Sequence, residues 1–196
     1  MRQPYTSQTP VRAVIDDPAF AGFGRMLFPT AFGAPPAGMT LHDIGRWLPF
    51  HNCIRDETTT RVLNELQARA AAGEQVFYPI YTDREQMQEP ARWDTGLFFF
   101  RGRPGAPFAV VSAGGGFYYV GSIHESLPHA LELSRRGYNA FALVYRPDSA
   151  CTACTDLARA VGTVCRYADA LKVSPEGYSL WGGSAGARMA AWVGSY

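Results

Sequence analysis

Ser184 stands at the centre of a short glycine-rich segment, Gly182-Gly183-Ser184-Ala185-Gly186, which matches the pattern G-x-S-x-G. In this pattern the serine sits on a very tight turn between a strand and a helix, and its hydroxyl projects above a sheet. Small flanking residues let the strand and the helix approach closely, and the positive end of the helix favours negative charge near the serine. The segment therefore predicts a serine nucleophile for acyl transfer, with Ser184 as the catalytic residue.

A second glycine-rich segment, Gly114–Gly116, directly follows an apolar run at 108–113. Three consecutive glycines leave backbone N–H groups unobstructed, and acyl transfer needs such donors to stabilise the oxyanion of the tetrahedral intermediate. We expect the N–H groups of Gly115, Gly116 and Ala185 to form this oxyanion hole. A nucleotide-binding loop is disfavoured, because the segment lacks the G-x-G-x-x-G spacing and no G-K-[ST] follows it.

The elements that must position these two segments alternate between strands and helices. Strands are predicted at 76–81, 97–101, 108–113, 139–146 and 178–182, and helices at 56–72, 123–136, 155–171 and from 185 onward. Ser122 and Glu125 have capping-box spacing at the start of the helix over 123–136. Such alternation is typical of a sheet covered by helices on both faces, with ligands at the carboxyl ends of its strands. Both glycine-rich segments come at such ends.

The first 74 residues have a different character. They are rich in glycine, proline and phenylalanine, and a helix after Thr40 and the helix over 56–72 are their clearest elements. They carry too many aromatic residues for a disordered linker. We therefore predict an N-terminal arm, residues 1–74, that packs on a main domain formed by residues 75–196.

The two glycine-rich motifs together resemble those of a known family. The segment SAGGGF followed by GGSAG is similar to the esterase and lipase branch of the α/β-hydrolase superfamily that is related to hormone-sensitive lipase and includes acetyl esterases. The resemblance covers about residues 75–196, the N-terminal portion of that fold, and Ala113 stands where the family commonly has a histidine. It implies a three-layer α/β sandwich with a mostly parallel central sheet. It also implies hydrolysis of short-acyl esters, acetylated carbohydrates among them, through an acyl-enzyme and without cofactor or metal.

The remaining catalytic groups are expected elsewhere. In this family the order along the chain is serine, acid, histidine. Residues 185–196 contain no Asp, Glu or His. The sequence thus predicts a fold truncated after the nucleophile helix and inactive by itself, with a separate C-terminal half or a second copy as the partners left open. It also predicts an exposed sheet edge and poor solubility.

Candidate substrate-binding residues follow the glycine loop. They are Phe117, Tyr118, Tyr119 and His124. The three aromatic residues either line the substrate pocket or pack the loop against the next helix. His124, which we place in the first turn of that helix, is expected to lie on the helix surface or to contact substrate, with a role as general base as the alternative.

Composition excludes several classes of function. The net charge of +1 argues against nucleic-acid binding, and no apolar run is long enough to span a membrane. The N-terminus lacks the apolar segment of a signal peptide, so we expect a cytoplasmic protein, with processed secretion left open. Cys151 and Cys154 form a C-x-x-C, but no second pair accompanies them as a zinc ribbon would require.

Two alternatives to an esterase remain open. One is a non-catalytic ligand-binding or interaction protein of the same fold, which the missing acid and histidine favour and the intact serine turn disfavours. The other is a serine peptidase of the prolyl-oligopeptidase type. That class carries a large propeller domain, which about 75 N-terminal residues cannot form.

Overall fold

The structure is a computed structural model that describes residues 3–50 and 54–195. At the centre of this part of the chain lies a five-stranded sheet. Its spatial order is β1-β2-β4-β3-β5. The strands are β1 (Phe77–Tyr78), β2 (Gly96–Phe100), β3 (Pro107–Ser112), β4 (Asn139–Val144) and β5 (Ser174–Gly182). Strand β2 runs antiparallel to both of its neighbours, whereas β4, β3 and β5 are parallel. The sheet is therefore mixed, with a parallel half that ends at β5.

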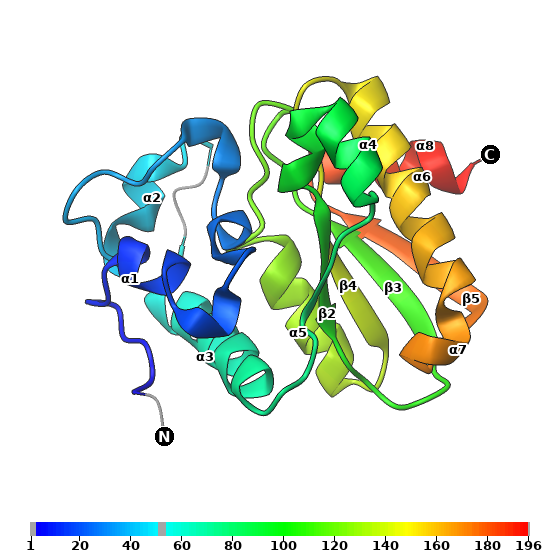
Figure 1. The fold of residues 1–196 in the computed structure, drawn as a ribbon, viewed down its shortest axis with the longest axis horizontal. Coiled ribbons are helices and arrows are strands. Elements are labelled where there is room, and N and C mark those ends of the chain that lie inside the picture. The colour runs from blue at the N-terminus through cyan, green and yellow to red at the C-terminus, as the bar shows by residue number, and fades with distance from the viewer. Residues whose placement is uncertain (1–2, 51–53, 196) are drawn as a thin grey trace.

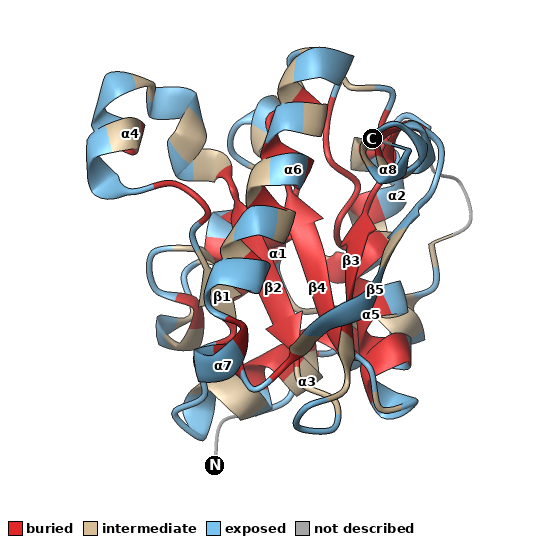
Figure 2. Ribbon diagram, turned by 90° about the vertical axis from the view of Figure 1, so that its right-hand side faces the viewer, coloured by how far each residue is buried: buried red, intermediate tan, exposed pale blue. Residues whose placement is uncertain are grey.

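Helices cover both faces of the sheet (Figure 1). Helix α5 (Ser126–Arg135) lies on one face, and α6 (Ala150–Arg166), α7 (Ala168–Leu171) and α8 (Ala185–Gly194) lie on the other. This arrangement confirms the predicted α/β class. Every residue of β2 and β4 is buried, as expected for apolar strands between two helical layers. Strand β5, in contrast, is largely exposed along the edge of the sheet (Figure 2).

The N-terminal segment packs against the outer side of α5 (Figure 1). It contains α1 (Val11–Ile15), α2 (Ile44–Trp47), α3 (Asp56–Ala71) and 3₁₀ helices at Pro18–Phe20, Gly24–Leu27, Thr30–Phe32 and Leu41–Asp43. Phe20, Leu27 and Leu63 share one buried cluster with Phe98 of β2 and Leu127 of α5. The segment is thus joined to the sheet by a continuous core. Within the described residues, none of the helices is long and apolar enough to cross a membrane.

Two strands differ in length from their predictions. Strand β1 covers only Phe77–Tyr78 of the predicted 76–81, because Pro79 has no N–H to donate to a neighbouring strand. Strand β5 begins at Ser174 rather than at 178, since it pairs with β3 from the Pro107–Ser174 contact onward and crosses an irregularity in the register.

Two helices begin at other residues than predicted. Helix α6 starts at Ala150, five residues earlier than expected, because the Ser149 hydroxyl accepts a hydrogen bond from the Thr152 N–H (3.1 Å) and caps it. Helix α5 starts at Ser126, and the predicted capping box of Ser122 and Glu125 does not form. The Glu125 side chain instead accepts a hydrogen bond from the backbone N–H of Gly114 in the glycine loop.

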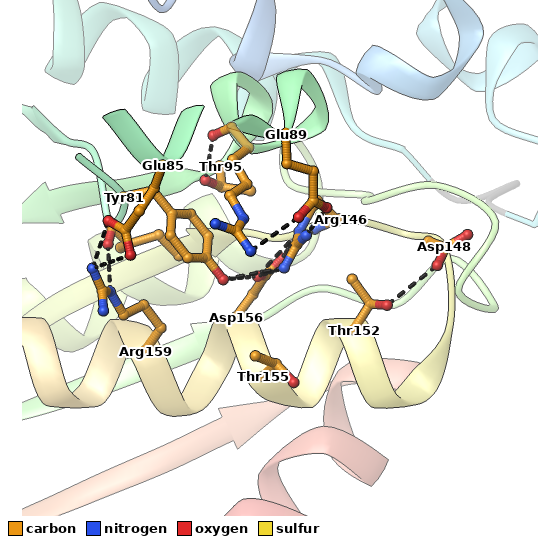
Figure 3. A network of polar contacts seen from close by, with 12 residues as sticks. Tyr81, Glu85, Glu89, Thr95, Arg146, Asp148, Thr152, Thr155, Asp156 and Arg159 are labelled. Carbon is orange, nitrogen blue, oxygen red and sulfur yellow. Dashed lines mark hydrogen bonds and ion pairs between the residues drawn. The ribbon is translucent and has the colours of Figure 1, made fainter. Parts of the chain in front are cut away.

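A buried ionic network attaches the helical segment between β1 and β2 to the rest of the fold (Figure 3). This segment consists of α4 (Asp83–Gln88) and the 3₁₀ helix Pro90–Asp94. Asp156 of α6 accepts hydrogen bonds from the Tyr81 hydroxyl (2.6 Å) and from the Arg146 guanidinium (2.7 Å). Burial, reinforced by the bond to Asp156, raises the pKa of Tyr81 to about 12, so that its hydroxyl remains a donor at neutral pH. The network therefore fixes the loop after β4 at the carboxyl edge of the sheet.

Candidate active site

Ser184 lies on the turn between β5 and α8, in a backbone conformation that serine rarely adopts. Its φ and ψ are 48° and −115°, and it is exposed. Positive φ values are costly for residues with a side chain and persist where the surrounding structure enforces them. The first residue of α8 follows immediately, so the positive end of that helix faces the serine. The local geometry is the one that the sequence predicted for a nucleophile.

Two glycines make this turn possible. A Cβ on Gly182 would lie 2.6 Å from the Ala187 nitrogen, and one on Gly186 would lie 2.7 Å from the Ser112 carbonyl carbon. Both clashes involve backbone atoms, which cannot move aside. The end of β5, the first turn of α8 and the end of β3 therefore meet backbone to backbone, which only glycine permits at these positions.

The glycine loop begins beside the serine turn. Ser112 pairs with Gly182 in the register of β3 and β5, so the two segments leave the sheet at the same level. A Cβ on Gly114 would lie 3.0 Å from the Ser184 Cβ. Among the described residues, no carbonyl accepts a hydrogen bond from the N–H groups of Gly115 and Gly116. The structure thus brings the predicted nucleophile and two of the predicted oxyanion donors together.

Two side chains behind the loop were not identified from the sequence. The buried Tyr145 hydroxyl donates to the Ala113 carbonyl (2.8 Å), and the Glu125 carboxylate accepts from the Gly114 N–H. Burial, with a contribution from the nearby Glu125 charge, raises the pKa of Tyr145 and keeps its hydroxyl protonated. Tyr145 follows strand β4 and Glu125 precedes helix α5. Because these elements are distant in the sequence, only their packing in the folded chain shows that the two side chains meet at the loop.

Comparison with known proteins bears on the fold of the chain. No protein-family model and no curated protein sequence matches the chain. Among solved structures, it is similar to an acetyl ester-xyloside bifunctional hydrolase from Caldicellulosiruptor lactoaceticus, with 28% identity, a TM-score of 0.55, and 60% of this chain and 46% of that chain covered. It is also similar to the esterase LipW from Mycobacterium marinum, with 26% identity, a TM-score of 0.52, and coverage of 70% and 44%. These likenesses support an α/β-hydrolase fold of the esterase and lipase branch.

The similarity extends over only part of each of those structures. The chain spans 46% of the first structure and 44% of the second, less than half of each. Activity and substrate are therefore matters for proposal.

The aromatic residues after the glycine loop of this α/β hydrolase have three different environments. Phe117, with a φ of 59°, lines an apolar cavity of about 690 Å³ between α6 and α8, where the Arg188 guanidinium lies 5.8 Å from the centre of its ring. Tyr118 is exposed and lines a more polar cavity of about 500 Å³ at the end of β4. Tyr119 is fully buried and packs against Phe32 and Phe50. Tyr119 therefore supports the loop, and Phe117 and Tyr118 face open space.

The histidines lie in different parts of the fold. His42 is in the N-terminal segment, where its Nδ1 lies 2.7 Å from the Asp56 carboxylate, which raises the pKa of His42. His124 lies in the turn before α5 and not on the helix as predicted, because the helix starts only at Ser126. In the described part of the chain, the Ser184 side chain makes no hydrogen bond to a histidine. His51 lies outside the described residues.

The cysteines of the hydrolase fold do not gather with other metal ligands. Cys151 and Cys154 lie on the first turns of α6 and line the apolar cavity with Phe117, and both are free thiols. Within residues 3–50 and 54–195, no group of three or more His, Cys, Asp or Glu side chains is placed to hold a metal ion. Cys53 lies outside the described residues.

Alanine at Gly186 is expected to lower the free energy of unfolding by about 3 kcal/mol, because its Cβ would overlap the backbone of β3. Gly162→Ala is the matched control, since Gly162 lies in α6 with no atom within 4 Å of the added Cβ. This control should be more stable than wild type by up to about 1 kcal/mol. Urea unfolding of the two variants measures both effects. Equal stabilities would contradict the close approach of α8 to β3.

Proposed function

We propose that this protein is a serine carboxylic-ester hydrolase whose nucleophile is Ser184. The observation that carries the proposal is the strained turn at Ser184 beside a loop with open N–H groups. Such strain has a cost, and it is retained where function requires it. Ser184 would attack the ester carbonyl while a base takes its proton, and the alcohol would leave from the tetrahedral intermediate. Water would then release the acid from the acyl-enzyme.

The oxyanion of the tetrahedral intermediate would be held by three backbone N–H groups. We assign this role to Gly115, Gly116 and Ala185. The Ala185 N–H is the first of α8, and the first N–H groups of a helix have no acceptor within it. Removing one such donor from a serine hydrolase typically lowers kcat by about 10²–10³-fold.

For the substrate we propose short-acyl esters, acetylated carbohydrates among them. The similar structure from Caldicellulosiruptor lactoaceticus is described as an acetyl ester-xyloside hydrolase. The cavity beside Tyr118 also contains Thr30, Asp148 and Thr152, whose hydroxyl and carboxylate groups suit a sugar alcohol. We expect kcat/KM to fall along a p-nitrophenyl ester series from acetate to octanoate. A rise along the series would contradict the short-acyl assignment.

Covalent labelling tests the nucleophile directly. The full-length gene product is treated with a fluorophosphonate probe, and the site of modification is read by peptide mass spectrometry. We expect a single adduct on Ser184, and none in the Ser184→Ala variant. A folded protein that takes no adduct at Ser184 would overturn the proposal and favour a non-catalytic binding protein of the same fold.

A further inference from the structure

Glu125 connects the two segments of the candidate site. Its Oε2 accepts a hydrogen bond from the Gly114 N–H, at the start of the glycine loop. The same oxygen lies 3.1 Å from the point where a Cβ on Gly183 would stand, next to Ser184. One carboxylate thus contacts the glycine loop on one side and the nucleophile turn on the other. It occupies space that a side chain at position 183 would otherwise fill.

Three further hydrogen bonds restrain the loop through its carbonyl groups. The Tyr145 hydroxyl donates a hydrogen bond to the Ala113 carbonyl. Within the loop, the Gly121 N–H donates to the Gly114 carbonyl (3.0 Å). The Tyr119 N–H donates to the Gly115 carbonyl (3.2 Å). Glu125 is the partner of an N–H group. Its bond sets the orientation of the peptide plane that immediately precedes the open N–H groups of Gly115 and Gly116.

Helix capping does not account for this residue. Glu125 is the N-cap of α5, yet its side chain makes no capping hydrogen bond to that helix. Its backbone N–H instead donates to the Gly121 carbonyl (3.1 Å) at the far end of the glycine loop. Backbone and side chain of Glu125 therefore both hold the loop, and the helix begins without the usual side-chain cap.

We propose that Glu125 is a positioning residue that braces the glycine loop against the nucleophile turn. By fixing the Gly114 peptide, it holds the N–H groups of Gly115 and Gly116 where an oxyanion forms next to Ser184. The role rests on the proposed function of Ser184. Because the negative charge of Glu125 opposes an oxyanion nearby, its contribution is the geometry of the hydrogen bond rather than its charge.

Kinetics of three variants of the full-length gene product test the brace. Active sites are counted with the fluorophosphonate probe, so that kcat refers to folded, reactive molecules only. We expect Glu125→Ala to lower kcat about 10–100-fold with KM within about 3-fold, since the misplaced donors act mainly in the transition state. Glu125→Gln should stay within about 3-fold of wild type, because its amide oxygen still accepts from Gly114.

Glu132→Ala is the control, because Glu132 lies on the exposed side of the same helix, where its carboxylate pairs with Arg136. It should retain wild-type kcat. An unchanged kcat in Glu125→Ala, or an equal loss in Glu125→Gln, would overturn the positioning role.

Amide hydrogen exchange, followed by NMR, tests the role of Glu125 in a way that does not depend on enzymatic activity. In Glu125→Ala the Gly114 amide should exchange at least about tenfold faster than in wild type, because its acceptor is gone. The Phe99 amide, which donates to the Val76 carbonyl on the opposite half of the sheet, should be unchanged. If wild-type Ser184 takes no probe but Gly114 exchange still responds, the proposed function fails while the brace stands. Unchanged Gly114 exchange overturns the brace itself.

Discussion

In the full-length gene product, replacing Ser184 by glycine is expected to abolish ester hydrolysis and, at the same time, to stabilise the protein by about 1 kcal/mol. A residue with a side chain at φ 48° and ψ −115° is strained by about 1–3 kcal/mol, and glycine adopts that conformation freely. The more flexible unfolded chain offsets part of the gain. Loss of the nucleophile should lower kcat by about 10⁴-fold or more.

Ser184→Ala is the matched control for this experiment. It removes the same hydroxyl but keeps the Cβ, so the backbone strain stays. It should be as inactive as the glycine variant, with a free energy of unfolding within about 0.5 kcal/mol of wild type. Urea unfolding and p-nitrophenyl acetate hydrolysis measure the two properties. If the glycine variant proves less stable than the alanine variant, the turn at Ser184 is not strained.

Removing the Asp156 carboxylate is expected to destabilise the fold by about 4 kcal/mol. Asp156 is fully buried and accepts hydrogen bonds from the Tyr81 hydroxyl and from the Arg146 backbone and guanidinium. Asp156→Ala leaves a buried Arg146 charge whose remaining ion pair among the described residues is with the partly exposed Glu89. An uncompensated buried charge has a far greater cost than the loss of a surface ion pair.

The chain supplies a direct comparison for this prediction. Asp16 pairs with Arg12 on the surface of α1, with both side chains more than half exposed. Asp16→Ala should change the free energy of unfolding by less than about 1 kcal/mol. Asp156→Asn, which keeps the shape and one acceptor, should fall between the two. Equal effects of the Asp156 and Asp16 changes would show that the network in Figure 3 contributes no more than a surface pair.

The sequence predicted the elements around Ser184 well because their signals are local. The apolar strand over 108–113 and the helix from Ala185 both appear in the structure within one residue. Glycine at 182 and 186 is readable from the pattern alone, since no other residue fits backbone contacts of this kind. The backbone that Gly186 contacts, however, lies at the end of β3, about 70 residues earlier, which the pattern does not reveal.

The starts of two helices were predicted wrongly because polar side chains had more than one possible partner or role. Ser122 and Glu125 have the spacing of a capping box, but the carboxylate bonds to Gly114, which tertiary packing brings closer than the helix end. The start of α6 was placed too late because Ser149 is one of several residues that could cap it. A spacing rule ranks local partners only, whereas a partly buried carboxylate bonds to the donor that the fold brings nearest.

By itself, the sequence determined the α/β class, the glycine loop and the position of Ser184 on a tight turn, because each depends on residues a few positions apart. Only the tertiary structure decided that Tyr145 and Glu125 lie behind that loop and that Phe117 and Tyr118 face different cavities. The physical reason is the order of the strands. Pairing of β3 with both β4 and β5 brings distant segments to one edge, and which side chains meet there depends on register, which no local pattern encodes.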